Sequence, residues 1–403
     1  MISFSPPRID QRVIDEVTAV LKSGWITTGP RTKEFEKKIT EYCGCKTTVA
    51  VTSWTAAMEL ILHWWGIGEG DEVILPAYTY CASANVILNI GAIPVMVDLN
   101  NEDFNLSVEA VRKAITPRTK AIMPVDIAGY PCDYDELFSL INEESILKQF
   151  TPNSDFQKQL GRILIASDSA HSFGALYNGK RIGSVADITC FSFHAVKNIT
   201  TAEGGAMSVN LPDSFDHEAI YKELCIKTLH GQSKDALSKT LKGNWKYDVT
   251  EPGYKCNMTD ISAAIGLVEL SRYQENMDRR KIIFNKYDEA FKNESWAILP
   301  LYKTGKKETC YHLYQLRFKD VSEEQRDALI QAIFDCEVAV NVHFLPLPIL
   351  TAYMNLGYKM VDYPEAWNKY YNEITLPVYF DLNDEQVDTV VAAVKKSVKL
   401  IIG

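Results

Sequence analysis

The sequence places one lysine, Lys197, where its amine can do chemistry. It follows the apolar run 187–193, DITCFSF, and precedes a glycine pair, Gly204 and Gly205, which leads into a second apolar run. Lysines usually lie on solvated surfaces, so one interpretation is an ordinary loop lysine between two strands. The other is a lysine at the carboxyl end of a sheet strand, facing the crevice where open α/β sheets bind ligands. A partly neutral amine there can form a Schiff base with an aldehyde cofactor.

Two further segments carry groups suited to the phosphate of such a cofactor. Ser192 lies five positions before Lys197 and offers a hydroxyl to a phosphate oxygen. At 51–57, VTSWTAA, a strand changes into a helix. The Thr55 hydroxyl and the backbone N–H groups of Thr55 and Ala56 would face an anion at that helix N-terminus. Taken singly, Ser192 and Thr55 are also what ordinary turns and caps contain.

A carboxylate and an imidazole follow another apolar run. Asp168 comes directly after 162–167, and His171 lies three positions later. Pyridoxal 5'-phosphate (PLP) withdraws electrons well while its pyridine nitrogen is protonated, and a buried aspartate beside that nitrogen retains the proton. His171 would lie near the cofactor's phenolic oxygen or stiffen Asp168. The alternative is an aspartate that caps the next turn.

Aromatic residues follow the apolar run 72–76, at Tyr78 and Tyr80. Such a ring can stack on the pyridine face of a cofactor and exclude water from it. Aromatic residues at strand ends also occur as plain core residues, so this alternative stays open.

The elements that must position these residues follow an α/β rhythm. Short β-branched runs alternate with longer helical stretches through the first 210 residues, which predicts a mostly parallel seven-stranded sheet flanked by helices. The predicted strands are 47–52, 72–76, 94–98, 121–126, 162–167, 187–193 and 205–209. Helices are predicted to begin near Thr55, Ala82, Ser107 and Asp133.

Two domains are predicted from the same pattern. Residues 1–259 form the large domain, and its polar stretch 140–161 is longer than a usual connection, which indicates a surface insertion. From Asp260 a long helical pattern leads into a smaller C-terminal α+β domain, 260–403.

Composition excludes several classes of function. The chain has 403 residues, 46% of them hydrophobic, and a formal net charge of -10, which argues against a nucleic-acid partner. No basic-apolar leader and no membrane-spanning run is visible, so a cytoplasmic protein is expected. The nine cysteines are scattered without a C-x-x-C pair, and we expect reduced thiols. Cys43 and Cys45 have no histidine nearby, so no metal site is predicted.

Together these segments resemble the DegT/DnrJ/EryC1/StrS family of sugar aminotransferases, a branch of the fold-type I PLP enzymes. The resemblance extends over nearly the whole chain. Its segments, in order, are GWITTGP (24–30), SWTAAMEL (53–60), LPAYTYCASANVILNIGAIPVMVDL (75–99), SDSAHSFGA (167–175), FSFHAVKNITTAEGGA (191–206), GYKCNMTDISAAIGLVEL (253–270), YHLYQLRF (311–318), VNVHFLP (340–346) and ITLPV (374–378).

The resemblance implies a role for each candidate residue. Lys197 would form the Schiff base with PLP and later move the proton between the cofactor and substrate carbons. The cofactor would be held by Asp168 at the pyridine nitrogen, His171 beside the ring, Tyr80 stacked on it, and Thr55, Ala56 and Ser192 at the phosphate. The family's site is completed across a homodimer, so Lys255 of the neighbouring subunit would reach the phosphate. Trp25, Thr27 and His343 match regions near the sugar substrate.

Three positions depart from the family pattern. Trp54 stands where a glycine often precedes the phosphate-binding threonine, and it would narrow the site or pack outward. Lys255 stands where an asparagine usually contacts phosphate, and a lysine can supply a charge-assisted bond instead. Asp126 replaces a frequent histidine, with no evident effect.

The resemblance implies an aminotransferase that moves an amino group from glutamate, or a similar donor, to a keto-sugar nucleotide. Family frequency favours a UDP-2-acetamido-4-keto-2,6-dideoxyhexose, giving a 4-amino sugar for a surface polysaccharide. A PLP-dependent sugar dehydratase is an alternative, but those enzymes replace the Schiff-base lysine with histidine. Cysteine desulfurases usually have histidine directly before the lysine, whereas Val196 precedes Lys197. A non-catalytic sensor of sugar nucleotides is the remaining alternative.

Overall fold

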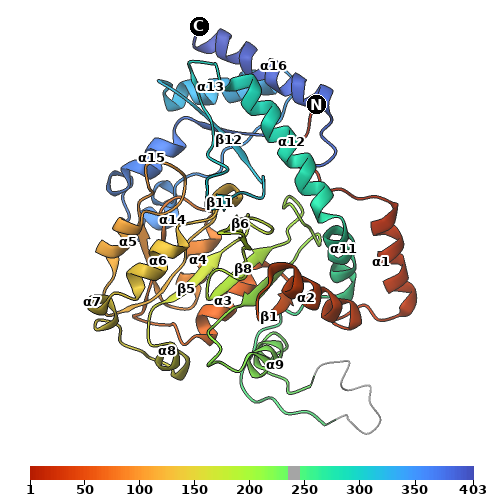
Figure 1. The fold of residues 1–403 in the computed structure, drawn as a ribbon, viewed down its shortest axis with the longest axis vertical. Coiled ribbons are helices and arrows are strands. Elements are labelled where there is room, and N and C mark those ends of the chain that lie inside the picture. The colour runs from red at the N-terminus through yellow and green to blue at the C-terminus, as the bar shows by residue number, and fades with distance from the viewer. Residues whose placement is uncertain (235–245) are drawn as a thin grey trace.

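The computed structural model describes residues 1–234 and 246–403 and has a larger and a smaller region (Figure 1). The larger one is built on a seven-stranded sheet in the order β1-β9-β8-β5-β4-β2-β3. Its strands are β1 (Thr47–Val51), β2 (Glu72–Pro76), β3 (Ile93–Val97), β4 (Thr119–Ile122), β5 (Leu164–Asp168), β8 (Ile188–Ser192) and β9 (Gly205–Val209). Only β9 is antiparallel to its neighbours, β1 and β8. The predicted mostly parallel sheet is confirmed, with strand ends shifted by a few residues.

Helices cover both faces of this sheet, as the strand sequences require. All five residues of β2 are buried, and Val73 and Leu75 belong to one apolar core while Ile74 belongs to the other. Because successive strand residues point to opposite faces, a strand with apolar residues at successive positions must be covered on both faces. The covering helices include α2 (Pro30–Cys43), α3 (Trp54–Trp64), α4 (Ala82–Asn89), α5 (Val108–Ala114), α6 (Tyr134–Ile141) and α9 (His217–Lys227).

The predicted helix starts are close to the observed ones. Ser107 caps α5 by accepting a hydrogen bond from the N–H of Ala110. Asp133 is the first residue before α6, but its side chain makes no capping hydrogen bond. Ala82 is the first residue of α4.

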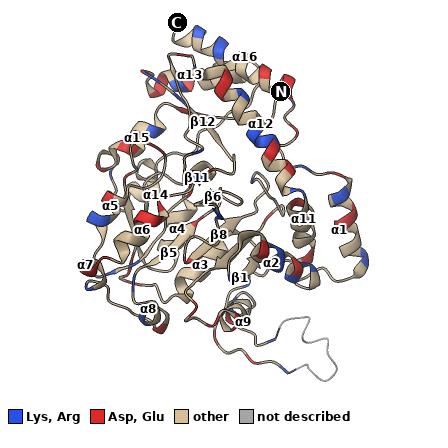
Figure 2. Ribbon diagram, viewed as in Figure 1, with Lys and Arg blue, Asp and Glu red and all other residues tan. Residues whose placement is uncertain are grey.

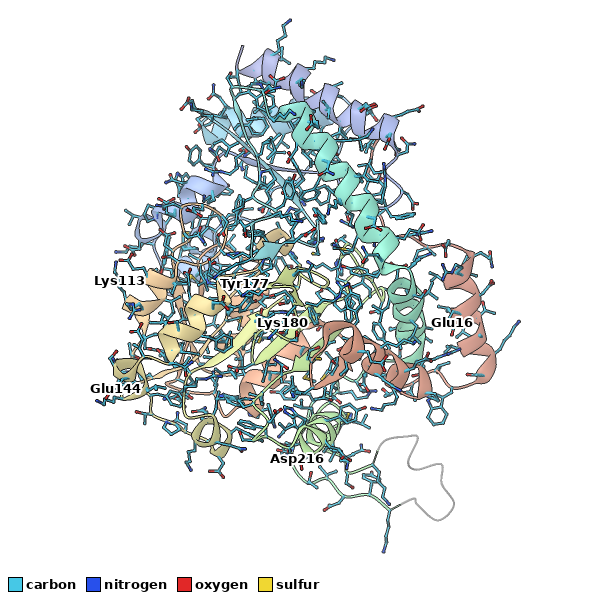
Figure 3. The ribbon with its side chains drawn as sticks, in the orientation of Figure 1. Glu16, Lys113, Glu144, Tyr177, Lys180 and Asp216 are labelled. Atoms are coloured by element: carbon cyan, nitrogen blue, oxygen red, sulfur yellow. The ribbon has the colours of Figure 1, made fainter. Side chains whose placement is uncertain are left out.

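The stretch 140–161, which was predicted to be a surface insertion, has both buried and exposed side chains. It contains α7 (Glu144–Leu147) and α8 (Asp155–Leu160). The buried side chain of Gln157 donates to the carbonyl of Trp65 over 3.0 Å, which closes the end of α3. Glu144 on α7 lies at the outer edge of the molecule (Figure 3). The segment therefore packs against the large domain through one side and is exposed on the other.

The smaller region contains a three-stranded sheet in the order β10-β12-β13. Its strands are β10 (Ala297–Ile298), β12 (Tyr314–Phe318) and β13 (Glu373–Leu376), and its main helices are α12 (Tyr273–Phe291), α13 (Glu323–Phe334) and α16 (Asp384–Ile401). Shorter elements are α14 (Thr351–Met354), α15 (Pro364–Tyr370), η2 (Leu347–Ile349) and η3 (Met360–Asp362). The α+β character predicted for this part of the chain agrees with these elements.

The regions share segments at their border. The helix α11 (Asp260–Ser271) packs against α1 (Gln11–Ser23) and α2, which belong with the large region. Residue Ile2, in contrast, bridges to Val338 in the small region. A short sheet joins β6 (Leu176–Tyr177), β7 (Lys180–Arg181) and β11 (Lys307–Glu308), and Tyr177 lies near the middle of the molecule (Figure 3). The domain boundary at 260 stays a prediction.

Acidic and basic residues are interspersed over the outer helices (Figure 2). In the described residues, no helix is both long and apolar enough to cross a membrane. All nine cysteines are unpaired. Within 1–234 and 246–403, no cluster of three or more His, Cys, Asp or Glu is arranged to hold a metal ion.

Candidate active site

A cavity of about 360 Å³ opens where β5 and β8 end and α3 begins. Asp168 is the last residue of β5, and Ser192 is the last residue of β8. Residues far apart in sequence meet here because parallel strands end at one edge of the sheet. Seven predicted site residues line this cavity: Thr55, Tyr80, Asp168, His171, Ser192, Lys197 and His343.

The amine of Lys197 lies in an environment that weakens its charge. Burial lowers the pKa of Lys197 to about 8, although the nearby Asp168 carboxylate and Cys310 thiol act in the opposite direction. The turn before it is closed by a 2.9 Å hydrogen bond from the Lys197 N–H to the carbonyl of His194. Next to it, the side chain of Asn198 donates to the carbonyl of Cys310 over 2.7 Å. The turn is therefore held, and about a tenth of the amine is neutral at pH 7.

Asp168 is a buried carboxylate with two hydrogen-bond donors. The Ser83 hydroxyl donates to Oδ2 over 2.7 Å, and the Ala170 N–H donates to Oδ1 over 3.2 Å. Burial raises the pKa of Asp168 to about 6, while these donors and Lys197 lower it. The carboxylate is thus mostly ionised at pH 7, as a partner for a protonated ring nitrogen must be.

Two histidine rings form one wall beside these groups. The ring centroids of His171 and His312 are 4.6 Å apart. Burial lowers the pKa of both rings well below the usual range, so both are neutral. Asn198 holds His312 through a 2.7 Å contact to its Nδ1. Nδ1 of His171 is buried and has no hydrogen-bond partner among the described residues, which leaves it for a ligand.

The predicted phosphate-binding groups are brought together by β9. Gly205 pairs with Val51 on one side and with Ser192 on the other, so the start of α3 lies beside Ser192. A Cβ at Gly205 would lie 2.5 Å from the carbonyl carbon of Ser53, so only glycine permits this approach. Thr55 is in the first turn of α3, where backbone N–H groups lack partners within the helix.

Ala56 is placed differently from Thr55. It does not line the cavity, and its N–H donates to the side chain of Ser53, the N-cap of α3, over 3.0 Å. A phosphate contact from Ala56 stays a prediction. Trp54, the first residue of α3, lines the cavity and also packs in the core, with 5% of its surface exposed.

Three other candidates lie outside this cavity. The indole N–H of Trp25 donates to the carbonyl of Thr28 over 3.2 Å, and the carbonyl of Thr27 accepts from the Asp260 N–H over 3.2 Å. The Lys255 amine donates to the side chain of Asn257. None of Trp25, Thr27 and Lys255 lines the cavity of its own chain.

Asp126, which stands where the family often has a histidine, supports the site through buried hydrogen bonds. Its Oδ1 accepts from the Cys132 N–H and the Tyr134 hydroxyl, over 2.8 and 2.9 Å. Its Oδ2 accepts from the Ser172 hydroxyl over 2.7 Å, and its own N–H donates to the carbonyl of Asp168. Asp126 therefore fixes the turn that carries Asp168 and His171.

Several lining residues were missed from the sequence. Phe4 and Ser5 line the cavity, and the Ser5 hydroxyl donates to the carbonyl of Val196 over 3.2 Å. No periodicity marks these residues, because the pairing of Ile2 with Val338 brings them there. His312 lies in the segment 311–318, which carries part of the family resemblance. Its residue type was the signal by which the sequence could have marked it.

The fold and the cavity define a class: a mixed α/β enzyme with a lysine of lowered pKa near a buried aspartate at the carboxyl edge of the sheet. The chain belongs to the DegT/DnrJ/EryC1/StrS aminotransferase family, whose model matches residues 7–148 and 155–395. The stretch between these ranges, 149–154, lies within the predicted insertion at 140–161.

Solved and curated relatives agree with this membership. Spr1654 of Streptococcus pneumoniae, assigned as a sugar aminotransferase and solved in its PMP form, is 48% identical with a TM-score of 0.96, over 100% of both chains. SpsC of Bacillus subtilis, a spore coat polysaccharide biosynthesis protein, is 36% identical over 99% of this chain and 97% of its own. An uncharacterized protein of Methanocaldococcus jannaschii is 39% identical over 98% of both.

Proposed function

We propose that the protein is a PLP-dependent aminotransferase that moves an amino group from glutamate to a keto-sugar nucleotide, with Lys197 as the catalytic residue. The observation that carries the proposal is one cavity holding both an amine of lowered pKa, Lys197, and a buried, ionised carboxylate, Asp168. A lysine and an aspartate in this relation suit the two ends of PLP, its aldehyde and its ring nitrogen.

The residues present fit PLP. Asp168 would pair with the ring nitrogen, His171 would use its unpartnered buried nitrogen beside the ring, and Tyr80 would lie against one face. The hydroxyls of Thr55 and Ser192 would hold the phosphate at the start of α3. When bound, PLP supplies an electron sink that stabilises negative charge on the carbon losing a proton.

The protein's own groups would then do the following. Neutral Lys197 would carry the proton from the donor's α-carbon to the cofactor carbon. In the second half of the reaction it would carry a proton from the cofactor carbon to the sugar carbon that becomes the amine-bearing carbon. Asp168 keeps the proton on the ring nitrogen throughout. His312 and Phe344 also line the cavity and would limit the access of water to the reacting carbons.

For the substrate we propose a UDP-2-acetamido-4-keto-2,6-dideoxyhexose, aminated at C4 for a surface polysaccharide. Support for the pathway comes from SpsC, a protein of polysaccharide biosynthesis. The test is incubation of the PLP-loaded protein with glutamate and a panel of keto-sugar nucleotides, followed by mass spectrometry and NMR of the products. An aminated sugar nucleotide with matching 2-oxoglutarate supports the proposal, and binding without conversion of any of them favours the sensor.

We also propose that two copies share each active site, with Lys255 of one reaching the phosphate site of the other. Tyr80 lines the cavity yet is 59% exposed, and α1 exposes Ile14 and Leu21, as expected of surfaces covered by a second copy. Lys197→Ala and Lys255→Ala proteins, each inactive at limiting PLP, should regain about a quarter of wild-type activity when refolded together. No recovery would contradict a shared site.

A further inference from the structure

His343 is held from behind by a chain of buried polar side chains. Asn341 and Thr375 form an antiparallel bridge, which places His343 opposite Glu373 on β13. Glu373 and Thr375 are two residues apart, so their side chains share one face of the strand. Both are fully buried, while His343 lines the cavity. This series of polar side chains therefore runs from the core to the cavity.

Hydrogen bonds connect these three residues in series. The ring Nδ1 of His343 is 3.0 Å from the Thr375 hydroxyl, which is 2.5 Å from Oε1 of Glu373. Oε2 of Glu373 accepts from the backbone N–H of His343 over 3.1 Å. The other ring nitrogen, Nε2, has no hydrogen-bond partner among the described residues and is left for a ligand.

The backbone of His343 is held as firmly as its ring. Its carbonyl accepts hydrogen bonds from the Tyr78 hydroxyl and from the side chain of Gln315, the latter over 2.7 Å. Phe4 stacks on the ring, with centroids 5.4 Å apart and planes at 20°. The ring thus has little freedom to reorient, and its interaction with a ligand depends on which nitrogen carries the proton.

One proton decides the direction of both hydrogen bonds. Neutral Glu373 donates to Thr375, the Thr375 hydroxyl donates to Nδ1, and the ring proton must lie on Nε2. Ionised Glu373 accepts from Thr375, whose oxygen then accepts from Nδ1–H, leaving a lone pair on Nε2. Between these states Glu373 loses one proton to solvent, and the neutral ring changes tautomer.

The surroundings allow Glu373 to exist in either state near neutral pH. Burial raises the pKa of Glu373 to about 8, against the hydrogen bonds and the positive charges of Arg326 on α13 and Arg317 on β12. The phenol of Tyr78 also faces it, and burial keeps that phenol neutral. Burial, with the nearby Lys197, lowers the pKa of His343 to about 3, so the ring stays neutral throughout.

We propose that Glu373, through Thr375, sets which ring nitrogen of His343 carries its proton and so decides whether His343 offers an N–H or a lone pair to the sugar. Glu373 and Thr375 are positioning residues, and His343 is the group that touches the substrate. With Glu373 neutral, Nε2–H donates to a sugar carbonyl or hydroxyl oxygen. Only the identity of this ligand rests on the proposed function.

The test reads the tautomer directly, by long-range ¹H–¹⁵N correlation NMR of PLP-loaded protein with ring-labelled histidine and no substrate. His343→Gln assigns the signal. The titration runs from about pH 6 to about pH 10. In the wild type, the His343 ring proton should lie on Nε2 at the lower pH and on Nδ1 at the higher pH, with the change centred near pH 8. In Glu373→Gln the amide donates to Thr375 at every pH, so Nε2 should stay protonated.

Matched variants keep the outcome interpretable. Glu385→Gln removes an exposed glutamate of the same region and should keep the wild-type transition. Thr375→Val breaks the chain of hydrogen bonds and should abolish the transition, and thermal melting verifies that each variant is folded. A wild-type His343 signal that is independent of pH, or an unchanged transition in Glu373→Gln, overturns the proposal. Neither result depends on whether keto-sugars are aminated, so failure of the proposed function would be seen separately.

Discussion

The Ser83 hydroxyl donates a 2.7 Å hydrogen bond to Oδ2 of Asp168, linking the first turn of α4 to the end of β5. Ser83 is itself 2.9 Å from the Thr79 hydroxyl. Because the carboxylate is buried, this bond is one of the forces that keep it ionised. Ser83 therefore affects the charge of Asp168, although no pattern in the sequence marks it.

Replacing Ser83 with alanine should weaken PLP binding at pH 7 about tenfold, since a hydrogen bond to a charged group contributes about 1.5 kcal/mol or more. The pKa of Asp168 would rise further, so the ionised form would be reached at higher pH and affinity should recover as the pH rises. Titration of the apoprotein with PLP at several pH values measures this. The exposed Ser145→Ala is the control, and equal affinity of Ser83→Ala and wild type would contradict the role.

Lys197→Ala should reduce transamination by at least about a thousandfold, because both proton transfers and the covalent hold on the cofactor are lost. Steady-state rates and the visible spectrum of the purified protein measure the loss. Lys197→Arg keeps the positive charge but offers no neutral amine, and it should be equally inactive. Near-normal turnover in either variant would remove Lys197 from the mechanism.

The pKa of Lys197 can be read from the capture of PLP by apoprotein. Only the neutral amine attacks the aldehyde, so the capture rate should rise with pH through about 8 and then level off. With a lysine of ordinary pKa, the rate of PLP capture would continue to rise until about pH 10. Stopped-flow absorbance distinguishes the two profiles, with Lys197→Ala as the control that shows no capture.

Phe4→Ala should raise KM for the sugar about fivefold and change kcat little. Phe4 stacks on His343 and lines the cavity, and an aromatic pair contributes about 1 kcal/mol beyond its buried area. KM for the amino donor, measured in the first half of the reaction, is the internal control. An equal fall in kcat for both halves would instead indicate damage to the cofactor site.

Asp126→Ala should lower the free energy of unfolding by about 3 kcal/mol, because it leaves several buried donors without an acceptor. These donors include the Cys132 N–H and the hydroxyls of Tyr134 and Ser172. Urea unfolding of the apoprotein measures the change. The exposed Asp381→Ala should lie within about 0.5 kcal/mol of wild type. A change that small in Asp126→Ala would contradict the supporting role of Asp126.

The strands of the large sheet, though not their exact ends, could be predicted from the sequence alone. The apolar runs that form β5 and β8 are buried on both faces, and their mostly apolar residues predict that burial. Asp168 and Ser192 close these runs, and Lys197 follows the second of them. Because parallel strands have their carboxyl ends at one edge of the sheet, the local sequence pattern was enough to predict that these residues lie close together.

The surroundings of Lys197 were decided only by the tertiary structure. Phe4 reaches the cavity because Ile2 pairs with Val338, and Glu373 reaches His343 because Thr375 pairs with Asn341. Such pairings join segments far apart in the chain, and no local periodicity reports them. The lowered pKa of Lys197 has the same origin, since burial of an amine depends on everything packed around it. The sequence by itself thus determined which residue types meet at the carboxyl edge of the sheet, and the folded packing decided their burial and their neighbours.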